Sequence, residues 1–444
     1  MKKQILWVAG LLATMVIACS PDANNPNPPT PGPDTTRTDT THKDTTDTIR
    51  HDTIPTIDTI RTDTMEFDSI VNLDNDRVVC SYVEWYCRSN NLIKGLYNYV
   101  TNICFAFAEL YVKDGVYQKF DLSGGSSAWT LFKQVVALKE KKPDLKIQVS
   151  FSHVVENSDN SQGGGFSAMA KSQEQMSHFA HDCKEFCKKW NIDGIDIDWE
   201  LPGISWSGHA CDPAVDTENY VKLMKTLRDT LPFGEYLLTY AGYPKDKEQV
   251  SGGWQFIDNM AVEPYVDWFN VMTYDMGSGI HNTPHNAIIS TGESFDWDIQ
   301  HMYHEFNKLG YPMHKMVLGL AFYGRVQYDE KPQTYDYWQI EQNIKKGTWT
   351  RYFHDVWKVP YVRGGGKMIC SYDDPESIAY KGKWAMDRGM RGFMWWAQGG
   401  DNDKRDLTRA SWNALKTRTD HYRYYIYHLS DSTTIVTEPF IVEE

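Results

Sequence analysis

DGIDIDWE, at residues 193–200, is the stretch that decides how the rest of this 444-residue chain is interpreted. Its side chains alternate, so in a β-strand Asp196, Asp198 and Glu200 share one face and apolar residues share the other. Burying an unpaired carboxylate costs on the order of several kcal/mol. A buried acidic face therefore indicates a site that needs shifted carboxylate pKa values. An exposed strand with one solvated acidic face is the alternative.

From Arg77 onward, short apolar runs alternate with helical patterns. This alternation predicts an α/β fold with a parallel sheet, and eight strands close naturally into a (β/α)8 TIM barrel. A doubly wound open sheet is the alternative, but no glycine-rich phosphate-binding sequence follows the first strand. The expected strands are 78–82, 102–107, 146–151, 194–199, 236–240, 268–273, 316–321 and 392–396.

The seventh strand–helix unit is longer than a connecting loop requires. Its extra residues, 326–371, are rich in Tyr and Trp and predict a small inserted lobe that walls one side of the barrel mouth. The barrel is expected to span 75–418, and 419–444 form a C-terminal extension without an assigned role. Helical periodicity is clearest at 172–190, 217–231, 294–309, 375–388 and 407–415.

The N-terminal residues predict export. Two lysines precede a short apolar run, which is typical of a signal peptide over 1–18. The residues before Cys19 resemble a bacterial lipoprotein box, which implies cleavage before Cys19 and lipid on its thiol. An ordinary signal peptide is the alternative. Residues 19–70, rich in Thr, Asp and Pro, predict a disordered spacer. We expect a lipid-anchored protein of the cell envelope, at the outer membrane or cell surface.

Composition limits the partners. The net charge of -14 argues against nucleic acid and anionic lipid. Aromatic residues make up 14% of the chain, which suits a cleft that stacks on sugar rings as well as a core. Seven cysteines follow Cys19 without regular spacing, so neither a disulfide framework nor a zinc site is expected. No metal or cofactor is predicted.

Chemistry in such a barrel is expected where strands end at the C-terminal face. The fourth strand puts Glu200 at this rim, with the two aspartates deeper on the same face. Acids, phenols and indole planes from other strands converge there and indicate a carbohydrate site. The candidates are Tyr82 at the end of the first strand and Trp85 after it, Phe107 on the second, Tyr274 and Asp275 after the sixth, and Trp396 on the eighth.

At this point the chain resembles glycoside hydrolase family 18, the chitinase family, over roughly 77–417. The family motif D-x-x-D-x-D-x-E is matched by residues 193–200, and 272–275, 319–325 and 372–378 give further matches. The resemblance implies that the inserted lobe is a shortened α+β lobe. One departure concerns the third strand, which usually ends S-x-G-G and here ends Ser150-Phe151-Ser152-His153. This departure puts the shape of the cleft floor in doubt.

The resemblance also implies a substrate-assisted mechanism. Glu200 would protonate the leaving oxygen, and the 2-acetamido oxygen of the substrate would attack the anomeric carbon with net retention. Asp198 would hold the acetamido N–H, and Asp196 would share a proton with Asp198. Tyr274 would orient the acetamido oxygen. Asp275 would support the same sugar and Trp396 would lie beneath it, while Tyr323 and Arg325 are either sugar-binding or structural.

These expectations leave three functions open. The leading one is endo-hydrolysis of β-1,4 bonds between N-acetylglucosamine units in chitin or chito-oligosaccharides by a monomer. The second is an endo-β-N-acetylglucosaminidase that acts on glycoprotein N-glycans. The third is a non-catalytic, lectin-like surface protein. The intact set of Glu200 and both aspartates favours an enzyme over the lectin.

Overall fold

The computed structural model describes residues 77–152, 163–204, 211–247, 257–276, 284–290, 298–326 and 332–416, and the backbone of 421–429 and 432–440. The predicted signal segment 1–18, Cys19, the spacer 19–70 and His153 lie outside these residues. Among the helices of the described ranges, none is long and apolar enough to cross a bilayer.

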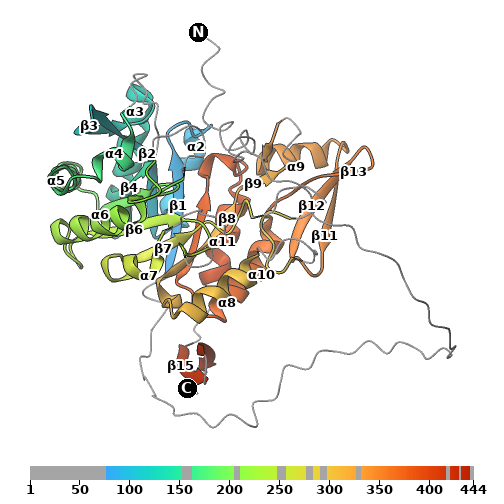
Figure 1. Ribbon diagram of the computed structural model, residues 1–444. Helices are drawn as coiled ribbons and strands as arrows, with labels where there is room; N and C mark the ends of the chain where they lie inside the picture. The colour runs from blue at the N-terminus through green and yellow to red at the C-terminus, as the bar shows by residue number, and fades with distance from the viewer. Residues whose placement is uncertain are drawn as a thin grey trace, which may run out of the picture.

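Eight parallel strands close into a barrel, which confirms the predicted (β/α)8 fold. Each strand pairs with the next in the order β1-β14-β8-β7-β6-β5-β4-β2, and β2 pairs with β1 to complete the circle. Figure 1 shows the strands at the centre, with helices around them. The strands are β1 Val78–Glu84, β2 Asn102–Lys113, β4 Lys146–Ser152, β5 Gly194–Asp198, β6 Leu237–Gly242, β7 Trp268–Val271, β8 Met316–Ala321 and β14 Gly392–Trp396.

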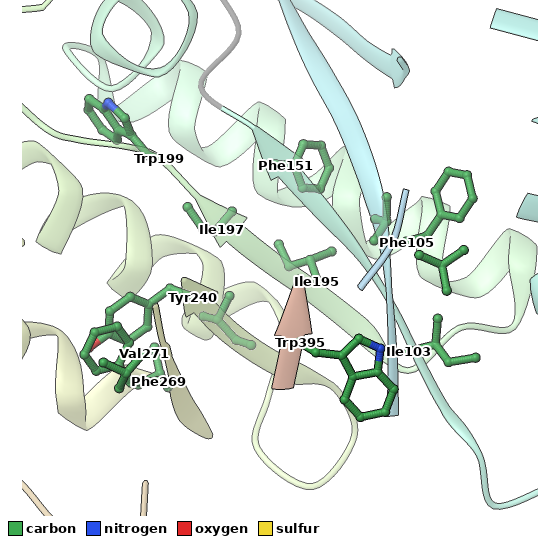
Figure 2. Close-up of a cluster of buried hydrophobic side chains, with 14 of the residues drawn as sticks. Ile103, Phe105, Phe151, Ile195, Ile197, Trp199, Tyr240, Phe269, Val271 and Trp395 are labelled. Carbon is green, nitrogen blue, oxygen red and sulfur yellow. The ribbon is translucent and has the colours of Figure 1, made fainter. Parts of the chain in front are cut away.

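The helices pack against the outward side chains of these strands. On β5, Ile195 and Ile197 point into this outer layer (Figure 2). Trp199, beyond the strand, stacks on Phe166 with ring centroids 5.4 Å apart. The inward face of β5 is thereby left to the acidic residues. The helices that follow the strands are α3 Gly125–Val136, α4 Gly165–Met169, α5 Gln173–Trp190, α6 Asp216–Thr230, α7 Asn259–Val262, α8 Ile299–Leu309, α10 Pro375–Met386 and α11 Asp406–Lys416, with the single turn α2 Asn90–Ile93 after β1.

Several boundaries differ from those predicted. The second strand continues to Lys113 and pairs antiparallel with β3 Val116–Leu122, a hairpin that was not predicted. The sixth strand ends at Val271 rather than at 273, because Thr273 N–H turns back to the carbonyl of Val271. Helix α8 begins at Ile299, and the Asp298 side chain caps it by accepting the backbone N–H of His301; residues 294–297 of the predicted helix lie outside the described residues.

The inserted lobe is a five-stranded antiparallel sheet with one helix, to one side of the barrel in Figure 1. It begins at residue 323, slightly earlier than predicted. Its strand order is β10-β9-β13-β12-β11. The elements are β9 Tyr323–Arg325, β10 Thr334–Asp336, α9 Tyr337–Lys345, β11 Thr350–His354, β12 Val359–Gly364 and β13 Lys367–Ser371.

A buried ion pair fixes the lobe to the barrel. Lys381 Nζ lies 2.7 and 2.8 Å from the two carboxylate oxygens of Asp373, and both residues are fully buried. Asp373 also accepts the backbone N–H of Ala321, at the end of β8, at 3.1 Å. The chain therefore leaves and re-enters the barrel at one carboxylate. Beyond α11, β15 His421–Leu429 and β16 Ser432–Phe440 form an antiparallel hairpin.

Candidate active site

The floor of the candidate site is a carboxylate that accepts hydrogen bonds from four strands. Asp196, on β5, receives Tyr82 Oη at 2.8 Å and Ser150 Oγ at 2.7 Å on one oxygen. Its other oxygen receives Thr239 Oγ1 at 2.5 Å and Asn270 Nδ2 at 3.1 Å. Burial raises the pKa of Asp196 above its ordinary value, although these four neutral donors oppose the rise.

Asp198 and Glu200 lie above this floor and interact with each other. Burial, together with the charges of Glu200 and Asp196, raises the pKa of Asp198 well above its ordinary value. Its Oδ1 is buried without a hydrogen-bond partner among the described residues. Burial and the negative charge of Asp275 raise the pKa of Glu200 to about 7. Glu200 can therefore hold or release a proton near neutral pH, as a general acid–base group must.

Asp275 forms a separate ionic cluster at the rim, after β7. It accepts a hydrogen bond from Tyr323 Oη at 2.8 Å and from Arg325 Nε at 2.8 Å, and Arg325 Nη2 contacts its other oxygen. His285 Nδ1 lies 3.1 Å from the Asp275 backbone nitrogen. Burial opposes ionisation, but the positive charge of Arg325 and its hydrogen bonds outweigh it and hold the pKa of Asp275 well below its usual range.

Tyr274 is a buried phenol beside the acids. Burial, followed by the negative charges of Asp198 and Glu200, raises the pKa of Tyr274 well above its ordinary value, so the hydroxyl remains a donor. The ring fits only because position 319 is glycine. A Cβ there would lie 2.9 Å from the Tyr274 ring and 2.5 Å from the carbonyl oxygen of Val271.

Two aromatic residues complete the inner cluster. Trp396, at the end of β14, stacks on Phe107 with ring centroids 5.3 Å apart and 19° between the planes. The ring centroids of Tyr82 and Trp396 lie 6.1 Å apart. Trp395 points to the outer layer, as strand alternation predicts, and stacks on Phe322 at 5.1 Å. The half-buried Trp396 thus offers an indole to the same space as the three acids.

The structure does not bring Trp85 into this cluster. It packs against the outer core, with its indole directly over Gly124, where a Cβ would lie 2.4 Å from the ring. The other ten predicted catalytic and substrate-binding residues lie in the acidic cluster, the rim cluster or the aromatic group around Trp396.

Sequence reasoning missed four polar partners of these residues. Ser150, Thr239 and Asn270 lie on inward faces of β4, β6 and β7 and bond Asp196. A single polar residue within each apolar strand was the available signal. Ser150 was noted only as part of the third-strand end that differs from the usual family sequence. His285 follows no pattern, because it lies in a loop. Ser152, the other described residue of the departure, is buried and pairs in register with Asp198.

No group of three or more His, Cys, Asp or Glu side chains in the described ranges could hold a metal ion. The seven cysteines after Cys19 are unpaired. What the strand ends gather instead is carboxyl groups, a phenol and an indole, a set that suits proton transfer to a bound sugar.

A family model, glycosyl hydrolases family 18, matches residues 77–401, which is most of the chain. The chain belongs to this family. It is 30% identical over 315 residues to "Chitinase A1" of Niallia circulans, an alignment that covers 61% of this chain and 43% of that protein. It is 25% identical over 367 residues to "Probable chitinase 2" of Drosophila melanogaster, covering 73% of this chain and 72% of that one.

The fold comparison agrees with the family. A solved structure of a glycoside hydrolase family 18 N-acetylglucosaminidase from Paenibacillus barengoltzii superposes with a TM-score of 0.62 and 26% identity, over 76% of this chain and 100% of that chain. This chain covers less than half the length of the Niallia circulans protein. The expected family and barrel are therefore confirmed.

Proposed function

We propose that the chain is a retaining glycosidase that cleaves β-1,4 bonds between N-acetylglucosamine units in chitin or chito-oligosaccharides. The observation that carries this proposal is the pairing of Glu200, whose pKa is about 7, with Asp198, whose Oδ1 lacks a partner among the described residues. A proton donor beside a buried carboxyl oxygen that no described residue bonds suits a substrate that brings its own amide. The chitinase names of two relatives support the same substrate.

In the proposed mechanism the substrate amide is the nucleophile. Its carbonyl oxygen attacks the anomeric carbon, the glycosidic C–O bond breaks, and Glu200 gives its proton to the leaving oxygen. Asp198 accepts the amide N–H and stabilises the positive charge of the oxazolinium ion. Glu200, now a carboxylate, takes a proton from water as the water oxygen attacks the same carbon. The bond between this carbon and the amide oxygen breaks in that step, which restores the acetamido group. Tyr274 orients the amide oxygen, and Trp396 lies under the ring.

The decisive test is Glu200→Gln. We expect hydrolysis of chito-oligosaccharides to fall by about 10²–10⁴-fold, because the proton donor is lost while the shape of the site is kept. Binding of the intact oligosaccharide, measured by calorimetry, should survive. Glu185→Gln, an exposed position on α5, is the matched control and should turn over normally. Near-wild-type turnover by Glu200→Gln would exclude this mechanism.

The same assay separates the remaining functions. Proton NMR of fresh product should show the β-anomer first, and an α-first product contradicts retention. A wild-type protein that cleaves only an N-glycosylated protein would be an endo-β-N-acetylglucosaminidase. Sugar binding without turnover on either substrate would identify a lectin. The complete acid set disfavours that last outcome.

We also propose that the mature protein is a monomer held at the cell envelope by lipid on Cys19. The motif before Cys19 is the support for this anchor. Mass spectrometry of the mature N-terminus tests it, and an unmodified or differently cleaved terminus would contradict the anchor. Sedimentation of the protein without its lipid tests the monomer.

A further inference from the structure

His285, in the described segment 284–290, bonds both the inserted lobe and the rim of the barrel. Its backbone N–H donates to Ser371 Oγ on β13 at 3.0 Å. Its carbonyl oxygen accepts the N–H of Met276, which follows β7, at 2.9 Å. The residue is buried, with 1% of its surface exposed. The ring of His285 is therefore fixed from two sides at the edge of the candidate site.

The ring reaches the backbone of Asp275, which has an unusual conformation. The φ of Asp275 is 57°, in the left-handed region that residues other than glycine rarely adopt. His285 Nδ1 lies 3.1 Å from the backbone nitrogen of Asp275 and accepts its N–H. Such a conformation persists only where the surrounding contacts enforce it. The His285 ring supplies a contact of this kind at the residue whose carboxylate meets Arg325.

The contacts of the ring indicate which of its nitrogens carries the proton. A nitrogen that accepts a backbone N–H is unprotonated, so in a neutral ring the proton is on Nε2. Nδ1 also lies 3.3 Å from Asp275 Oδ1, but that oxygen already accepts Tyr323 Oη and Arg325 Nε, both at 2.8 Å. A proton on Nδ1 would add a third donor to this oxygen and take away the acceptor of the backbone N–H. The proton is therefore better placed on Nε2.

The surroundings keep the ring neutral. Burial is the largest influence and lowers the pKa of His285, and the positive charge of Arg325 on β9 acts in the same direction. The negative charges of Asp275, after β7, and Asp373, after β13, oppose this change without reversing it. Tyr323 adds a phenol ring whose centroid lies 5.4 Å from that of the imidazole. At neutral pH, Nδ1 is therefore free of a proton and can act as an acceptor.

We propose that His285 is a positioning residue of the candidate active site: its unprotonated Nδ1 holds the backbone of Asp275, so that the Asp275 carboxylate acts on Glu200 from a fixed place. The proposal rests on the proposed function, in which Glu200 is the proton donor. Asp198 on β5 and Tyr274 after β7 also face Glu200. Of the three groups around Glu200, Asp275 is the one that His285 bonds, so the effect of His285 should pass through it.

The first test compares two substitutions that differ at the position of Nδ1. His285→Asn puts an amide oxygen there and keeps an acceptor, whereas His285→Leu puts a methyl group there. In His285→Leu the basic limb of the pH profile of kcat should move to lower pH by about half a unit, because Asp275 is no longer held where it raises the pKa of Glu200. His285→Asn should keep the wild-type limb. His181→Leu, with 68% of its side chain exposed on α5, is the control and should also keep it.

A double substitution separates positioning from a general loss of stability. Asp275→Asn has no charge left to position, so adding His285→Leu to it should move the basic limb no further. A further shift in the double variant overturns the proposal. Equal shifts in His285→Asn and His285→Leu also overturn it, as does an unchanged limb in His285→Leu.

The second test measures the position of the proton in the wild-type protein without substrate. Nitrogen NMR of protein labelled at histidine, with the His285 signals assigned by their loss in His285→Asn, should show a protonated Nε2 and an unprotonated Nδ1 near neutral pH. A proton on Nδ1 overturns the proposal. This measurement does not depend on hydrolysis. A wild-type protein that shows the expected ring state but does not cleave chito-oligosaccharides would therefore contradict the proposed function and leave the contact between His285 and Asp275 supported.

Discussion

Asp196 at the floor of the site is fully buried and Asp275 at its rim keeps 17% of its side chain exposed, yet their pKa values move in opposite directions. Asp196 is surrounded by neutral hydroxyl and amide donors, and its pKa stays raised. Asp275 faces the guanidinium of Arg325, and its pKa is held well below its usual range. Neutral donors only reduce the rise in carboxyl pKa that burial causes, whereas a neighbouring cation reverses that rise.

This difference assigns separate functions to the two regions. The floor holds two carboxyl groups with raised pKa values, because the charge of Asp196 acts on Asp198 and both are buried. The rim holds a permanent negative charge that raises the pKa of Glu200. The barrel can therefore hold four acidic side chains close together, because they do not all carry a negative charge at the same pH.

The largest effect should come from removing the cation at the rim. Arg325→Met leaves Asp275 buried without its partner, and the free energy of unfolding should fall by about 3–5 kcal/mol at neutral pH. Urea unfolding measures it, with the exposed Arg363→Met as the control. The pKa of Asp275 is lower in the folded than in the unfolded chain, so its contribution is full above about pH 4 and lost as the pH falls further. The two proteins should therefore converge in stability below about pH 4, and a difference that grows in acid would contradict the account.

Removing the charge of Asp275 should have a smaller effect, on Glu200, the proposed proton donor. Asp275→Asn keeps the shape of the side chain but removes the field that raises the pKa of Glu200. The basic limb of the pH profile of kcat should move from near pH 7 to lower pH by about one unit, equivalent to about 1.4 kcal/mol. A basic limb that stays in place or moves upward would show that Asp275 does not act on Glu200 through its charge.

The smallest effect should come from the floor. Tyr82→Phe removes one of four neutral donors from Asp196, and we expect about 1 kcal/mol loss of stability by thermal unfolding. Tyr220→Phe is the control, because the Tyr220 hydroxyl is buried without a partner in the described part of the chain and should be lost at no cost. If Tyr82→Phe destabilises the protein as much as Arg325→Met, the contrast between floor and rim is wrong.

The barrel and the acidic face of residues 196, 198 and 200 were predictable because both follow from local periodicity. The alternation over 193–200 fixes which side chains face inward, and the apolar runs fix the strand order. The hairpin of β2 and β3 was missed although its signal was present. Asp114-Gly115, both with positive φ, is a typical hairpin turn between residues that favour strands.

The partners of the acids were harder to predict, because they depend on three-dimensional register. Thr239 and Asn270 bond Asp196 only because β5, β6 and β7 align as they do. His285 reaches Asp275 across a loop. Trp85 was expected at the cleft because it follows a strand end, but it lies three positions after Tyr82, an odd offset, so it packs outward over Gly124.

The buried ion pair of Asp373 and Lys381, which fixes the lobe to the barrel, has a consequence for engineering. Ala321 and Asp373 are in hydrogen-bond contact, and Arg325 pairs directly with Ser371. The chain between Arg325 and Ser371 is therefore a cassette whose two ends are already neighbours, as at sites where natural domains accept insertions. The segment between Arg325 and Ser371 could be replaced by a short turn or by a lobe of another size. Tyr323 and Arg325 would stay in the protein, because both precede the replaced segment.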